Sequence, residues 1–116
     1  MITGFEEITK DLTDYEYQKV VPMVYAGLKN KVGKEQAVSN SYMVDKLKEK
    51  GVTTSTRRIR KIIHFLRITG KIKGLIGSSK GYYITYNQEE LQEYCKSLEE
   101  RANSILSIKE ILEKQL

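Results

Sequence analysis

The segment RRIRKIIHFLR, residues 57–67, constrains the fold more than any other part of the chain. Ile59, Ile62, Ile63 and Leu66 recur at the i, i+3, i+4, i+7 spacing, so they share one face of a helix. The opposite face carries four basic residues and the only histidine of the chain: Arg57, Arg60, Lys61, His64 and Arg67. The pattern predicts a helix whose inner face is anchored in a core and whose outer face is positively charged.

The charge of the chain is concentrated around this helix. Residues 51–87 hold eight Lys or Arg and no Asp or Glu, although the net charge of the whole chain is only +5. A solvated surface usually mixes both signs, and a helix in water gains from Glu–Lys pairs four residues apart, which are missing here. We therefore expect the positive charge to be left for an external polyanion.

Two helical patterns precede this segment. The first covers residues 12–34, with a capping-box spacing between Thr13 and Glu16 and a kink or break expected at Pro22. Its apolar residues are expected in the core: Met23, Tyr25 and Leu28. The second runs from a cap at Ser39 or Asn40 to about Lys50 and is preceded by a possible short strand at residues 37–38.

The third helix begins after one of three candidate caps, Thr53, Thr54 or Ser55, and ends at Gly70. Its short connection to the second helix contains Gly51, which is helix-turn-helix spacing. After Gly70 the hydrophobic period changes, because apolar and β-branched residues flank the turn GSSKG in the segment KIKGLIGSSKGYYIT. This is typical of a hairpin. The fold class is therefore mainly α (α+β), with three helices, a basic hairpin and a long C-terminal helix.

The tail, residues 88–116, reads as one helix that Asn87 caps, so residues 1–87 and 88–116 are expected to form separate domains. Apolar residues recur every seven positions along this helix, from Leu91 to Leu112, and Cys95 and Ala102 lie between them. This spacing is typical of a coiled coil. The expected dimerisation residues are Leu91, Cys95, Leu98, Ala102, Ile105 and Leu112. Packing of this helix on the first helix of the same chain is the alternative. Cys95 is expected to be a small buried apolar residue.

Several classes of protein are disfavoured. No apolar run is long enough to span a membrane, and the N-terminus does not resemble a signal peptide, so a cytoplasmic protein is expected. One cysteine and one histidine cannot form a disulfide or a four-ligand zinc site of the Cys/His kind. No paired carboxylates or Ser/His/Asp set suggests an enzyme, and no cofactor or metal is expected. The glycines at 74, 77 and 81 lack the spacing of a nucleotide-binding loop.

Double-stranded DNA is the partner that fits a basic helix. A helix fits the major groove, its arginines and lysines reach guanine edges or phosphate oxygens, and a basic hairpin adds a second contact. Arg58 lies near the edge of the basic face and is expected to support phosphate contact only. The candidate DNA-binding residues are Thr54, Ser55, Thr56, Arg57, Arg58, Arg60, Lys61, His64, Arg67, Lys71, Lys73, Ser78, Ser79 and Lys80.

Three helices with a basic third helix, followed by GLIGSSKGYYIT, resemble a winged helix-turn-helix domain over about residues 13–87. The resemblance implies DNA binding by residues 55–67 and by a wing at residues 74–86. With the acidic helical tail, the chain is also similar to small winged-helix proteins of bacteriophages and prophages. That likeness implies a role in gene control or phage DNA metabolism, in the cytoplasm of a bacterial or phage-infected cell. A module that binds an acidic host protein surface is the alternative function.

Overall fold

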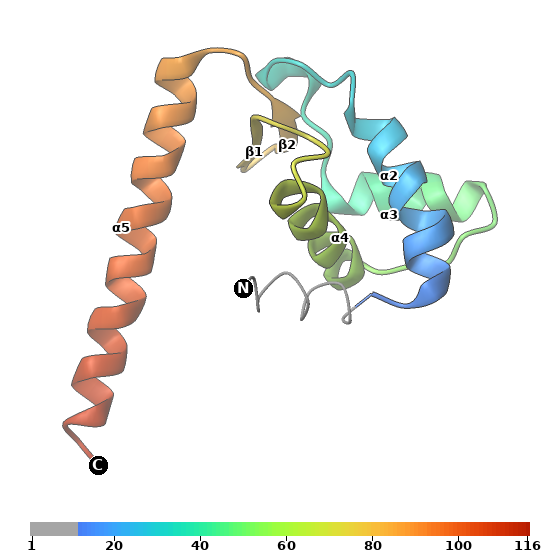
Figure 1. Cartoon of the computed structure of the whole chain (residues 1–116). Helices are drawn as coiled ribbons and strands as arrows, with labels where there is room; N and C mark the ends of the chain where they lie inside the picture. The colour runs from blue at the N-terminus through green and yellow to red at the C-terminus, as the bar shows by residue number, and fades with distance from the viewer. Residues whose placement is uncertain (1–11) are drawn as a thin grey trace. The chain divides into compact units, whose positions relative to one another are not determined.

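The computed structural model describes residues 12–116, which form two compact units divided between Thr85 and Tyr86. The first unit contains η1 (Glu16–Val20), α2 (Val21–Leu28), η2 (Lys34–Gln36), α3 (Asn40–Glu49), α4 (Thr56–Ile68), β1 (Leu75–Ser78) and β2 (Gly81–Ile84). The second unit contains α5 (Gln88–Glu113). The protein is therefore mainly helical with one antiparallel hairpin, as the sequence predicted (Figure 1). Residues 1–11 lie outside the described part of the chain.

The first helical region begins with the predicted capping box. The Thr13 N–H donates to Glu16 Oε1 at 2.9 Å, and the Glu16 N–H donates to Thr13 Oγ1 at 3.1 Å. No break occurs at Pro22. Instead, η1 is a π-helical turn in which the Val21 N–H donates to the Glu16 carbonyl, five residues back. Because Pro22 has no N–H and its ring crowds the preceding turn, a widened turn directly before it keeps the helix continuous.

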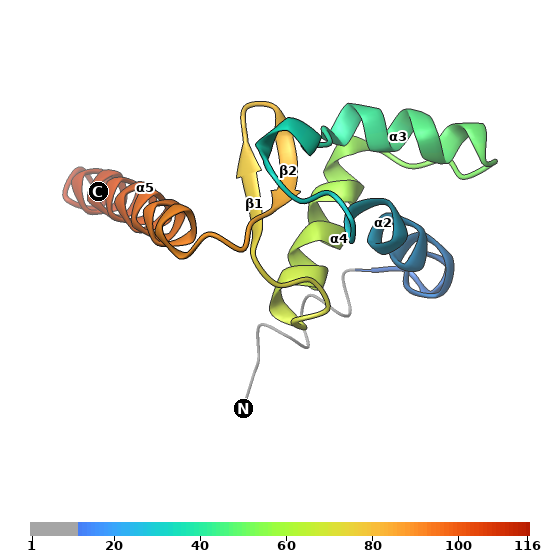
Figure 2. The same ribbon diagram turned by 90° about the horizontal axis from the view of Figure 1, so that it is seen from above.

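Serine residues cap the next two helices. Ser39 Oγ accepts from the Tyr42 N–H at 3.1 Å, and Ser55 Oγ accepts from the Arg58 N–H at 3.2 Å. Gly51 lies in the short connection with φ +82°, a conformation that glycine adopts without strain. The caps and this turn set α3 and α4 across each other at a steep angle (Figure 2).

The hairpin is fastened to the helices by a third segment. β1 and β2 pair antiparallel, and β2 also exchanges two backbone hydrogen bonds with Val38, at 2.8 and 2.9 Å. The strand expected at residues 37–38 is thus reduced to a single bridge between Val38 and Tyr82. Gly81 makes this approach possible, since a Cβ at that position would lie 2.3 Å from the Val38 carbonyl oxygen. On both views α4 lies between the hairpin and η1–α2 (Figures 1 and 2).

The core of the first unit lies under α4. The predicted inner face of that helix is confirmed, because Ile59, Ile62, Ile63 and Leu66 are all buried. Among the apolar residues of α2, Leu28 is fully buried and Met23 is half-buried. The prediction for Tyr25 was wrong: its side chain is 36% exposed, because it lies on the outer side of α2.

Candidate nucleic-acid interface

The outer face of α4 presents three basic side chains and a histidine to solvent. Arg57, Arg60 and His64 are exposed, and Lys61 is half-buried. They lie opposite the buried isoleucines, since a helix turns by 100° per residue. α4 holds no Asp or Glu, and its N-terminal cap is a neutral serine. This surface therefore offers positive charge along two turns of one rigid helix.

Arg58 does not belong to that exposed cluster. Its Nε donates to Glu16 Oε2 at 2.7 Å, and its Nη2 donates to Glu16 Oε1. The two hydrogen bonds hold the pKa of the Glu16 carboxyl below its ordinary value of 4.5, against the opposing effect of burial. The expectation that all the charge of this helix is left for an external partner is therefore wrong for Arg58, which fastens α4 to η1.

Arg67 joins the last turn of α4 to the hairpin. Its Nη2 and Nε donate to the Leu75 carbonyl at 3.0 and 3.3 Å, and its guanidinium carbon lies 5.7 Å from the centre of the Tyr82 ring. Both contacts fix the base of the hairpin against the helix. Arg58 and Arg67 thus stand at the two flanks of the cationic face, each bound to a neighbouring element.

The polar residues at the start of α4 also differ in whether they face solvent. The Ser55 hydroxyl caps the helix, and Thr56 is half-buried. The Thr54 hydroxyl oxygen is buried, with no hydrogen-bond partner among the described residues. It therefore does not face a partner lying on the outer face of α4.

The loop and hairpin place three more lysines at the surface. Lys71 and Lys73 are exposed on either side of the buried Ile72, and Ser79 and Lys80 are exposed at the hairpin tip. Ser78 is occupied within the turn: its Oγ donates to the Gly81 carbonyl at 2.9 Å and accepts from the Lys80 N–H at 3.2 Å. Ser78 therefore shapes the tip that presents Lys80.

The structure adds neighbours of Lys80 that the sequence did not single out. Lys80 shares a shallow, mostly polar hollow of about 290 Å³ with Lys31, Ser39 and Tyr42, and one acid, Glu35, also lines it. The hairpin tip therefore lies beside the N-terminus of α3, where backbone N–H groups favour anions. The distance in sequence between residues 31 and 80 hid this arrangement, which depends on the bridge between Val38 and Tyr82.

The expected dimerisation residues lie on α5, none of whose residues is buried. Large apolar side chains there are strongly exposed, with Leu91 at 37%, Leu98 at 42%, Ile105 at 66% and Leu112 at 55%. Cys95, which was expected to be buried, is exposed on α5, and so is Ala102. The predicted cap is confirmed, because Asn87 Oδ1 accepts from the Glu90 N–H at 3.0 Å.

Between residues 12 and 116, no three His, Cys, Asp or Glu side chains gather as metal ligands would, and no helix is long and apolar enough to cross a membrane. Comparisons with protein-family models, curated proteins and solved structures gave no match to this chain. Its binding partner must therefore be inferred from its own side chains.

Proposed function

We propose that this chain is a non-enzymatic protein of winged-helix type that binds double-stranded DNA, in the setting of a phage or prophage regulator or DNA-metabolism factor. The observation that carries the proposal is the outer face of α4, where Arg57, Arg60 and His64 are exposed opposite a fully apolar inner face. Such a helix can enter the major groove, which is about 12 Å wide. The hairpin, with Lys80 at its tip, contacts the DNA backbone beside it.

Fluorescence anisotropy with a labelled random-sequence duplex, measured across a salt series, tests the proposal. If four phosphates are neutralised per chain, affinity falls by roughly 100-fold between 50 and 200 mM salt. Arg57→Ala and Arg60→Ala should each weaken binding and lower the salt slope by about one. Lys19→Ala is the matched control, because Lys19 is an exposed cation on η1, outside the proposed interface.

Binding that is absent at low salt, or unchanged in both arginine variants, would overturn the proposal. The basic face would then belong to the alternative function, contact with an acidic protein surface. Neither arginine has a hydrogen bond or ion pair with another side chain among the described contacts, so their loss should leave stability nearly unchanged. Urea unfolding of the same samples separates lost binding from lost structure.

We further propose that α5 joins two copies of the chain. Leu91, Leu98, Ile105 and Leu112 repeat every seven residues, which keeps an apolar seam in register between two supercoiled helices. Two linked domains would contact two half-sites on DNA.

Light scattering on the full chain tests the dimer. Ile105→Asp places a charge in the seam and should halve the mass, because an unpaired carboxylate is costly to bury. Ser107→Asp is the control. It adds the same charge two residues further along, on the opposite face of α5, and should leave the mass unchanged. A single-chain mass for the unmodified protein would instead favour packing of α5 within its own chain.

A further inference from the structure

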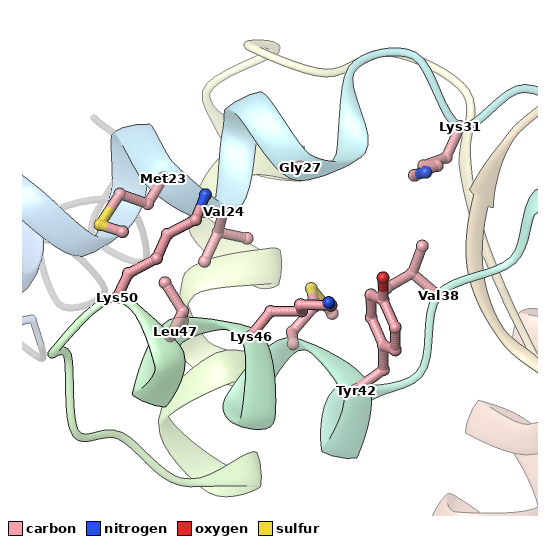
Figure 3. A pocket seen from close by; sticks show the side chains of 10 residues that line it. Met23, Val24, Gly27, Lys31, Val38, Tyr42, Lys46, Leu47 and Lys50 are labelled. Carbon is pink, nitrogen blue, oxygen red and sulfur yellow. The ribbon is translucent and has the colours of Figure 1, made fainter.

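A pocket of about 190 Å³ opens between α2 and α3, and no residue of α4 lines it (Figure 3). Its two walls follow from helical spacing. Met23, Gly27 and Lys31 recur every four residues along one edge of α2 and just beyond its end. The facing edge of α3 contributes Tyr42 and Lys46, and Lys50 follows at the same spacing just beyond its end.

The floor of the pocket is apolar. It is formed by buried core residues that expose only their outer edges: Val24, Val38, Met43 and Leu47. Gly27 leaves the upper wall open, since nothing lies within 4 Å of where its Cβ would be. An enclosed apolar cavity of about 150 Å³ can hold one benzene ring. This pocket is partly open to solvent and has a comparable volume. The pocket is therefore large enough for a single ring or a short acyl chain.

The rim is cationic. Figure 3 shows the amines of Lys31, Lys46 and Lys50 around the opening, with the Tyr42 hydroxyl directed into it. Among the described residues, no Asp or Glu lines the pocket. The Lys46 amine also lies 3.6 Å from Oε2 of Glu49, a residue that does not line the pocket, in a pair that is exposed on both sides. An exposed pair of this kind is weak and is exchanged readily for another anion.

We propose that this pocket binds a small carboxylate that carries one aromatic ring or a short acyl chain. The apolar part lies against Met43 and Leu47, and the carboxylate lies at the rim between the lysine amines and accepts from the Tyr42 hydroxyl. The apolar floor disfavours a purely polar anion such as inorganic phosphate, and the rim disfavours a neutral or cationic ring. None of these residues lies on α4, although Lys31 and Tyr42 also line the hollow beside Lys80. Binding of the carboxylate is tested without DNA, so its failure and the failure of DNA binding are distinguishable.

Titration of the ¹⁵N-labelled full chain with benzoate, followed by two-dimensional NMR, tests this site. We expect saturable shifts at the amides of Gly27, Tyr42 and Leu47, with a dissociation constant on the order of 1 mM. Benzamide has nearly the same shape without the charge and should bind at least about tenfold more weakly, because it loses the attraction of the amines. Equal affinity for the two compounds, or no shifts with benzoate, would overturn the proposal.

Two variants locate the binding. Gly27→Leu fills the pocket from a helical position that favours leucine over glycine, so it should abolish the benzoate shifts without unfolding the protein. The double variant Lys46→Gln and Lys50→Gln should weaken benzoate at least about tenfold and bring it close to benzamide. Lys48→Gln, an exposed lysine on α3 that does not line the pocket, should change nothing. Benzoate shifts that persist in Gly27→Leu would refute the assignment of the site. The assignment would also be refuted if titration with an acidic peptide saturated the amide shifts and titration with benzoate did not.

Discussion

Replacing Glu16 with glutamine should destabilise the first unit, because this carboxylate joins the segment before η1 to α4. Glu16 accepts from the Thr13 N–H at the start of η1 and from two nitrogens of Arg58 on α4. The residue is buried, with 8% of its surface exposed. Glutamine keeps the shape and the acceptor for Thr13 but removes the charge that Arg58 requires.

The size of the effect follows from burial. Hydrogen bonds to charged groups contribute about 1.5–3 kcal/mol, and breaking a fully buried ion pair costs about 3–5 kcal/mol. The Glu16 side chain is 10% exposed and that of Arg58 is 30% exposed, so the unpaired guanidinium regains part of its hydration. We therefore expect the free energy of unfolding to fall by about 2 kcal/mol in Glu16→Gln.

The effect should also depend on pH. The pKa of Glu16 is lowered in the folded protein, chiefly by its hydrogen bonds to Arg58. The folded state therefore binds the proton less readily than the unfolded chain, and the contribution of Glu16 is complete above the ordinary value of 4.5. It is lost as the pH falls from there through the folded pKa. Glu16→Gln should lose this dependence, so the difference between the two proteins should shrink in acid.

Urea unfolding followed by tyrosine fluorescence measures this effect, because most of the tyrosines lie before residue 86. A double-mutant cycle with Arg58→Gln should give a coupling energy of about 1.5–3 kcal/mol. Glu49→Gln is the control: its exposed pair with Lys46 should contribute less than about 1 kcal/mol. A loss below about 0.5 kcal/mol in Glu16→Gln, or the same loss at every pH, would refute the structural role of the pair.

Two further changes test the elements beside the cationic face, both measured by urea unfolding. Gly81→Ala should lower the free energy of unfolding by more than about 2 kcal/mol, because φ is +121° and the new Cβ would press on the Val38 carbonyl. Gly27→Ala is the control: nothing lies near its Cβ position on α2, so it should not destabilise the protein. Ser55→Ala removes the cap that accepts from the Arg58 N–H and should cost about 1 kcal/mol, so an unchanged midpoint would mean that another residue caps α4.

Local pattern was sufficient to predict most of the helices. The inner face of α4, the capping box of Thr13 and Glu16, and the cap at Asn87 depend on residues at most seven positions apart. Their chemistry is therefore visible in a short window of sequence. The turn around Ser79 was also predictable, because the change of hydrophobic period and the flanking glycines are both local signals.

Long-range contacts were not predictable in the same way. The pairing of Glu16 with Arg58 spans 42 residues, and the bridge from Val38 to Tyr82 joins segments that no periodicity connects. The π-helical turn before Pro22 was missed for a different reason: a proline inside a helical pattern permits either a break or a widened turn. The sequence does not say which of the two costs less free energy.

The same limit applies to the cations of α4, and it decides how their function can be tested. From the sequence alone, Arg57, Arg60 and Arg67 look equivalent, and Arg58 differs from them only by its place near the edge of the basic face. In the folded chain, Arg58 binds Glu16 and Arg67 binds the Leu75 carbonyl. Loss of affinity in variants of those two would therefore report a disturbed fold as readily as a lost contact with DNA. Arg57 and Arg60 are exposed. Variants of these two arginines therefore change the surface charge without disturbing the helix that carries it.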